Sequence, residues 1–152
     1  MTTETTGSTL ARFDQAWAEL DQTVKGLGER ELTEIRDPAG WSAKDHLMHV
    51  AAWEQTLLAK GDGRPRHQVL GIDAATDASG DEEAINAAIF AATRHRPLRD
   101  VLDVLRSTHA ATRARLTAAA PDPQLLADVP GYTEHYEQHR GWIRELVGGR
   151  AS

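Results

Sequence analysis

The chain contains no cysteine among its 152 residues, and this absence excludes several kinds of chemistry. Disulfide bonds, thiolate nucleophiles and sulfur-ligated metal sites all require cysteine. Any metal ion must therefore be held by histidine nitrogens and oxygen ligands.

Basic residues are too few and too scattered to favour a nucleic-acid partner. The chain has 17 Lys and Arg against 23 Asp and Glu, which gives a formal net charge of −6 at pH 7. Such a chain has no electrostatic reason to approach a phosphate backbone. We therefore expect a small-molecule substrate and no nucleic acid.

Long apolar runs are absent as well. A membrane-spanning helix needs roughly 20 consecutive apolar residues, and no stretch of the sequence approaches that length. The first residues also lack the basic and apolar regions of a secretory signal. We expect a cytoplasmic protein that makes no membrane contact.

Apolar residues that recur three and four positions apart predict helices along most of the chain. The clearest stripe follows Ser8 and consists of Leu10, Phe13, Trp17, Leu20, Val24 and Leu27. Further helices are predicted over 42–60, 79–96, 97–120 and 132–147, with connections at 29–40, 61–78 and 121–131. Strand-like alternation and hairpin turn signals are absent.

These patterns predict an all-α fold, a four-helix bundle with an additional short helix. The length and an apolar content of 40% suit one domain with a single core. We place this domain at residues 8–148, with a flexible tail at 1–7 and a second tail at 149–152. The oligomeric state stays open, and a homodimer formed through an exposed helix face is compatible with the pattern.

Local signals refine the helix ends. Ser42 with Asp45, and Ser79 with Glu82, have the spacing of capping boxes, and Pro97 suits the first turn of a helix. The connection at 61–78 is long for a compact domain, and such loops often act as lids over a pocket.

Three histidines are the best candidates for a metal site. His135 and His139 are four residues apart, so they project from nearly the same side of a helix. His49 lies two turns into the helix that begins at Ser42 and would supply the third ligand. Three imidazoles leave a coordination position open for water or substrate, as in catalytic sites. The set suits zinc, nickel or iron.

Other polar and aromatic residues have weaker assignments. His46 is placed for a staple contact with Trp41, which favours packing over a metal role. His109, inside an apolar stripe, is interpreted as a core or pocket histidine. Glu54 and Glu134 are candidates for a general base or for a carboxylate that orients an imidazole. Trp53 follows His49 by one turn and is either core or the wall of an apolar pocket.

The sequence resembles the DinB/YfiT-like superfamily in three features. Trp41 and Ser42 open a helix, His49 follows Trp41 by eight residues, and the final helix carries His135 and His139. A closer resemblance is to the ClbS/DfsB branch, through residues 40–42, 51–54, 94–98 and 133–139, together with Asn86 and Ile89. The similarity covers about residues 8 to 147. The segment 126–131 is shorter than in that branch, and we expect it to border the pocket mouth.

The resemblance implies a four-helix bundle with a three-histidine site for a divalent metal. It also implies a protein that disarms a reactive electrophile, similar to a self-resistance hydrolase that opens a DNA-alkylating cyclopropane. Our leading hypothesis is therefore a hydrolase whose ion, held by His49, His135 and His139, lowers the pKa of a bound water toward about 7. Trp17, Trp53 and Tyr136 would form the pocket wall.

Three alternatives remain open at this stage. The same metal could activate a low-molecular-weight thiol such as mycothiol for transfer or isomerisation, as in other DinB-like proteins. The protein could also sequester a toxic small molecule without turnover, or have a purely structural role. A thiol requirement, protection that saturates at one ligand per chain, or indifference to loss of all three histidines would distinguish them.

Overall fold

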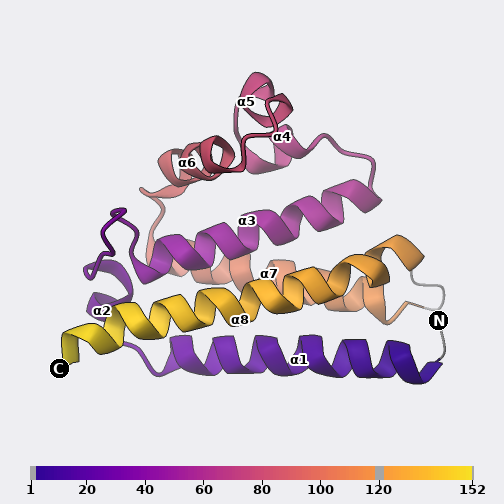
Figure 1. Cartoon of the computed structure of the whole chain (residues 1–152), viewed down its shortest axis with the longest axis horizontal. Coiled ribbons are helices and arrows are strands. Elements are labelled where there is room, and N and C mark those ends of the chain that lie inside the picture. Colours follow the sequence, from indigo (N-terminus) through magenta and orange to yellow (C-terminus); the bar gives the residue numbers. More distant parts are fainter. Residues whose placement is uncertain (1–2, 119–121, 152) are drawn as a thin grey trace.

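Four long helices form a bundle in the computed structural model of the chain, which describes residues 3–118 and 122–151 (Figure 1). The long helices are α1 (Thr3–Lys25), α3 (Ala43–Gly61), α7 (Leu98–Leu116) and α8 (Pro123–Ala151). The shorter ones are α2 (Glu29–Thr33), α4 (Arg66–Leu70), α5 (Ala74–Ala78) and α6 (Glu82–Thr93). No strand occurs in these ranges, and the prediction of an all-α fold is confirmed.

The predicted stripe of the first helix faces the core. Phe13, Leu20 and Val24 are buried, while the other three members of the stripe are partly buried and pack against the same cluster. α1 lies along α8, and α3 contacts both α7 and α8. α4, α5 and α6 lie together on the far side of α3 from α1 (Figure 1). The short helices α4, α5 and α6 thus cover one side of α3, and the other long helices cover the opposite side.

The start of α3 is fixed as predicted. Ser42 is the N-cap: its hydroxyl accepts a hydrogen bond from the Asp45 N–H, and its own N–H donates to Asp45 Oδ2 at 2.9 Å. This capping box satisfies two backbone N–H groups that a helix end otherwise leaves free. It anchors the helix that carries His49.

Several predicted boundaries are wrong. α1 begins at Thr3 rather than Ser8, and the connections at 29–40 and 61–78 contain α2, α4 and α5. These helices have only five residues each, too few to show an apolar period. Residues 1 and 2 lie outside the described ranges.

The helix predicted over 79–96 is shorter at both ends. Asp81, not Ser79, is the N-cap of α6, and its side chain accepts a hydrogen bond from the Ala84 N–H. The helix ends at Thr93, so Arg96 lies outside it. Pro97 is the N-cap of α7 rather than its first helical residue. Ser79 is instead the C-cap of α5.

The last helix differs most from the prediction. α8 begins at Pro123, includes Pro130 and continues to Ala151, whereas the sequence predicted a helix over 132–147 and a tail at 149–152. Proline removes one helical hydrogen bond and usually ends a helix. Here Leu125 and Val129 are both buried in the core, so packing of the first two turns outweighs that loss. Pro121 and Ser152 lie outside the described ranges.

In the part of the chain that the structure describes, no helix combines the length and apolar character needed to cross a membrane.

Candidate metal centre

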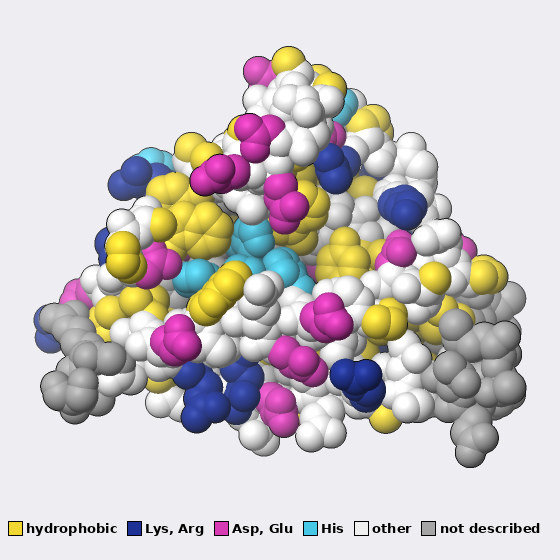
Figure 2. All heavy atoms as spheres, viewed as in Figure 1, with side chains coloured by type: hydrophobic (Ala, Val, Ile, Leu, Met, Phe, Trp, Pro, Cys, Tyr) yellow, Lys and Arg dark blue, Asp and Glu magenta, His cyan; other side chains and the backbone are white. Residues whose placement is uncertain are grey.

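The structure brings the three predicted histidines together. His49 comes from α3, and His135 and His139 come from successive turns of α8. One ring nitrogen from each lies within 4.8 Å of the others. Figure 2 shows histidine side chains gathered in a hollow at the centre of one face, beside hydrophobic side chains. Two segments about 85 residues apart thus form one cluster, as the sequence predicted.

The three rings are in the neutral form that binds metals. Burial lowers the pKa of His49 to about 3, that of His135 to about 4 and that of His139 to about 2. For His49 and His139 these values include a smaller contribution from the neighbouring histidine rings. A neutral imidazole offers a lone pair without first losing a proton.

An unpaired nitrogen in the cluster also favours the binding of an ion. Among the side chains that the structure describes, Nδ1 of His49 is buried and has no hydrogen-bond partner. Leaving a buried polar nitrogen unpaired is costly, so such an atom needs a ligand. A set of three imidazoles with one unpaired nitrogen fits a divalent ion such as zinc, nickel or iron.

A cavity of about 410 Å³ opens beside His49 and His135. Its other lining residues are Trp53, Arg66, Gly80, Glu82, Ile85, Gly131, Tyr132, Glu134 and Gln138. Two predicted site residues, Trp53 and Glu134, therefore lie beside the cluster. The mixture of aromatic, apolar and charged side chains suits a small polar molecule with an apolar part.

Trp53 is held firmly as one wall of the cavity. Its indole Nε1 donates a hydrogen bond to Asn86 Oδ1 at 3.0 Å, and the Arg66 guanidinium lies 5.5 Å from its ring. Arg66 is itself paired with Asp77 in α5. These contacts connect the short helices α4, α5 and α6 to α3 beside the cavity.

The two connections that were expected to border a pocket do reach this cavity. Arg66, inside the segment 61–78 that was predicted as a long loop, lines it, and so does Gly80, two residues beyond the end of that segment. Gly131, at the end of the shortened segment 126–131, lines it as well. That segment is helical and forms part of α8.

Tyr136, Glu54 and Trp17 lie elsewhere. The Tyr136 hydroxyl donates a hydrogen bond to Glu54 Oε1 and lies 2.9 Å from His109 Nδ1. The Trp17 ring stacks on His109, with centroids 4.0 Å apart. Glu54, His109 and Tyr136 are buried inside the bundle with Trp17 half-buried beside them, and none of the four lines the cavity. The structure therefore does not bring Trp17 and Tyr136 to the predicted pocket wall, and Glu54 orients no ligand histidine.

Burial raises the pKa of Glu54 to about 7, although a hydrogen bond from Thr112 opposes the change. Burial also lowers the pKa of His109 to about 4. Both groups are thus biased toward their neutral forms. The interpretation of His109 as a core histidine fits its position.

His46 has a larger role than the sequence indicated. It makes the predicted contact with Trp41, with ring centroids 5.2 Å apart. Its Nδ1 also lies 3.0 Å from Nδ1 of His139, and its Nε2 lies 3.2 Å from Asp37 Oδ2. Burial lowers its pKa, while Asp37 and Asp45 oppose that change. Sequence reasoning missed Asp37, because it is a turn residue outside any helical stripe.

The chain belongs to the DinB superfamily, which it matches over residues 12–144. The match begins within α1 and ends within α8, and so includes all three histidines of the cluster. Comparisons with curated proteins and with solved structures find no match. The fold and the histidine cluster agree with the superfamily expected from the sequence.

Proposed function

We propose that the protein is a metal-dependent enzyme that disarms a reactive electrophilic small molecule by hydrolysis. The observation that carries this proposal is the cluster of three neutral imidazoles beside an open cavity of substrate size. When bound, a divalent ion in such a site supplies Lewis acidity and lowers the pKa of water. Membership in the DinB superfamily supports metal use, and the resemblance to the ClbS/DfsB branch supports hydrolysis.

The side chains around the cavity suggest how the substrate is held. Trp53 and Ile85 offer apolar surface, while Arg66 and Gln138 offer hydrogen-bond donors. Glu134 is exposed and lines the same cavity, so it is the carboxylate that we assign to accept a proton from the attacking water. Glu54, whose carboxyl is engaged inside the bundle, is a structural group in this account.

The reaction is the addition of water to a strained or activated carbon. The water oxygen bonds to that carbon, the strained bond breaks, and one proton passes from the water to the leaving atom. Glu134 carries that proton between the two positions. The product therefore gains the mass of one water molecule.

The proposal is tested by incubating the zinc-loaded protein with a panel of epoxides and activated cyclopropanes, with and without mycothiol. Mass spectrometry should find hydrated product in excess of the protein when no thiol is present. His135→Ala and Glu134→Gln should lower the rate, whereas His95→Ala, at an exposed corner, should not. Products that form only with mycothiol would indicate the thiol-transferase alternative. Consumption that stops at one molecule per chain would indicate sequestration.

A further inference from the structure

One ring nitrogen of His139 is already engaged by another histidine. Its Nδ1 lies 3.0 Å from Nδ1 of His46, and both side chains are buried. Two ring nitrogens at this distance share one proton, so that one donates and the other accepts. The direction of this hydrogen bond decides which nitrogen of His139 keeps a lone pair.

Asp37 sets that direction. Its Oδ2 lies 3.2 Å from Nε2 of His46, and a carboxylate can only accept, so the proton is on Nε2 of His46. In a neutral imidazole the other nitrogen is then an acceptor. Nδ1 of His46 therefore accepts from the Nδ1–H of His139. This leaves Nε2 of His139 with a lone pair.

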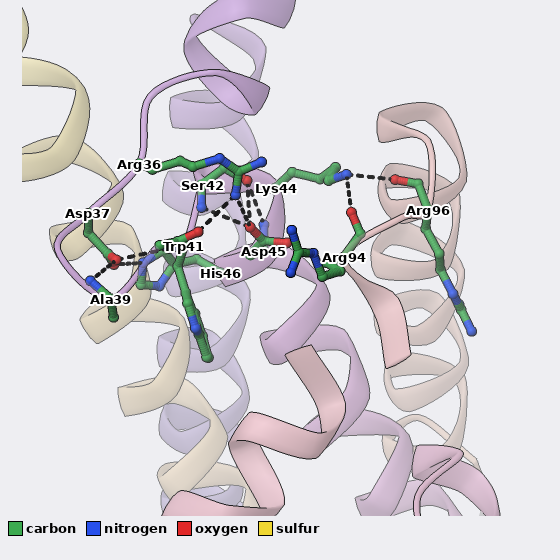
Figure 3. Close-up of polar contacts among 11 residues, drawn as sticks. Arg36, Asp37, Ala39, Trp41, Ser42, Lys44, Asp45, His46, Arg94 and Arg96 are labelled. Carbon is green, nitrogen blue, oxygen red and sulfur yellow. Dashed lines mark hydrogen bonds and ion pairs between the residues drawn. The ribbon is translucent and has the colours of Figure 1, made fainter. Parts of the chain in front are cut away.

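Asp37 is locked in place by its own turn. Its Oδ1 accepts hydrogen bonds from the N–H groups of Ala39 and Trp41, at 3.0 and 2.9 Å (Figure 3). Gly40 completes the turn at a φ of +90°, a conformation that favours glycine. With Oδ1 engaged by the backbone, Oδ2 is the oxygen that remains for His46.

The opposite arrangement would prevent His139 from acting as a ligand through Nε2. If Nδ1 of His46 donated, Nδ1 of His139 would accept and its Nε2 would carry a proton. A protonated nitrogen has no lone pair for a metal ion. The arrangement in the structure is thus the one that suits the candidate metal centre.

We propose that Asp37 and His46 are positioning residues that hold His139 in the tautomer whose Nε2 is free to ligate a divalent ion. This inference rests on the proposed function, since it assigns a purpose within the same metal centre. Neither residue ligates the ion, and both act through His139. Partners of this kind change metal affinity by about 10- to 100-fold.

The relay, by which we mean the chain of hydrogen bonds from Asp37 through His46 to His139, is tested first in the metal-free protein. Long-range proton–nitrogen NMR correlations of the metal-free protein, labelled with ¹⁵N at histidine, identify the protonated nitrogen of each ring. The expected result is Nδ1–H for His139 and Nε2–H for His46. The reverse tautomers would overturn the proposal, whether or not the protein binds metal.

The second test measures zinc affinity by competition with a chromophoric chelator. In Asp37→Asn the single amide oxygen must accept from the backbone, so the NH₂ group faces His46 and favours its other tautomer. We expect about a 10- to 100-fold loss of zinc affinity, together with Nδ1–H on His46. Asp73→Asn, which changes an exposed helix cap that neither joins the cluster nor lines the cavity, is the matched control and should retain the parent affinity.

Substitutions of His46 separate its hydrogen bond from its bulk. His46→Phe removes the acceptor and should lose about 10- to 100-fold in zinc affinity. His46→Asn can place an amide oxygen near the position of Nδ1 and should recover much of that loss. Parent affinity in both Asp37→Asn and His46→Phe would overturn the relay while leaving the three-histidine site intact. Failure of the parent to bind zinc would instead contradict the metal centre itself, and the NMR result would still decide the relay.

Discussion

The Tyr136 hydroxyl joins Glu54 to His109 across the centre of the bundle, where Tyr136 has only 1% of its surface exposed. Glu54 comes from α3, His109 from α7 and Tyr136 from α8, so one hydroxyl connects three of the four long helices. The residue before Tyr136 in α8 is His135, a member of the candidate metal centre. Consecutive residues of α8 thus face different surroundings: His135 faces the cavity and Tyr136 faces the core.

Tyr136→Phe should destabilise the protein without disrupting the cluster of His49, His135 and His139. The substitution leaves Glu54 and His109 each short of a partner in the core, which costs about 1–3 kcal/mol. Urea denaturation at pH 7 measures the change in the free energy of unfolding. Tyr132→Phe is the matched control: its hydroxyl donates to the Trp53 carbonyl from a half-buried position, and its loss should cost only about 0.5–1.5 kcal/mol. Equal losses in the two variants would contradict a special role for the buried network.

Glu54→Gln should change how stability depends on pH. Below pH 4.5 the Glu54 carboxyl is protonated in both the folded and the unfolded chain. Between pH 4.5 and about 7 the folded chain retains a proton that the unfolded chain loses, so the parent becomes less stable as the pH rises. This penalty, on the order of 3 kcal/mol, is complete above pH 7.

Glutamine does not titrate, so the penalty is absent from the variant. The free energy of unfolding of Glu54→Gln minus that of the parent should therefore rise from pH 4.5 to 7 and then level off. Urea denaturation across this range measures the difference, from which titration of other groups largely cancels. A difference that stays constant with pH would show that Glu54 keeps its ordinary pKa.

Substitutions of two glycines in α8 test the stability of the helix separately from access to the cavity. Neither Gly131 nor Gly141 has a neighbouring atom where a Cβ would lie, so Gly131→Ala and Gly141→Ala should each stabilise the helix by about 0.5–1 kcal/mol. Thermal denaturation monitored by circular dichroism measures this gain. A loss of stability in either variant would contradict the open space at that position.

A larger side chain should distinguish the two positions by activity. Gly131 lines the cavity and Gly141 does not. Gly131→Phe should lower kcat/KM for the hydrolysis by about tenfold, equivalent to about 1.4 kcal/mol, with unchanged metal content. Gly141→Phe should retain the parent value. Equal activities in the two variants would place the substrate elsewhere.

The sequence was sufficient to predict the helices that carry the histidine cluster. The spacing of His135 and His139 and the cap at Ser42 depend only on residues that are close in sequence. They can therefore be predicted without knowledge of contacts between distant segments. The stripe that contains Phe13 and Leu20 identified the core for the same reason. The prediction of the all-α fold depended on these periodic segments and on the absence of strand-like alternation.

Other features depended on contacts between distant segments. Periodicity places Tyr136 on a buried stripe, but it does not say whether that stripe faces the cavity or the centre of the bundle. Pro130 was interpreted as outside a helix, because the burial of Val129 that outweighs it is a tertiary effect. The partner of His46 lies 93 residues away in sequence, so no local pattern could reveal it.

The most direct test of the account is the metal content of protein purified without an affinity tag and exposed to zinc, nickel or iron. Elemental analysis should find about one ion per chain in the parent, and this ion should be lost in both His49→Ala and His135→Ala. His95→Ala should retain it, which would tie the ion to the cluster rather than to histidine content. A parent that binds no ion under any of these conditions, or variants that keep it, would contradict the three-histidine metal centre.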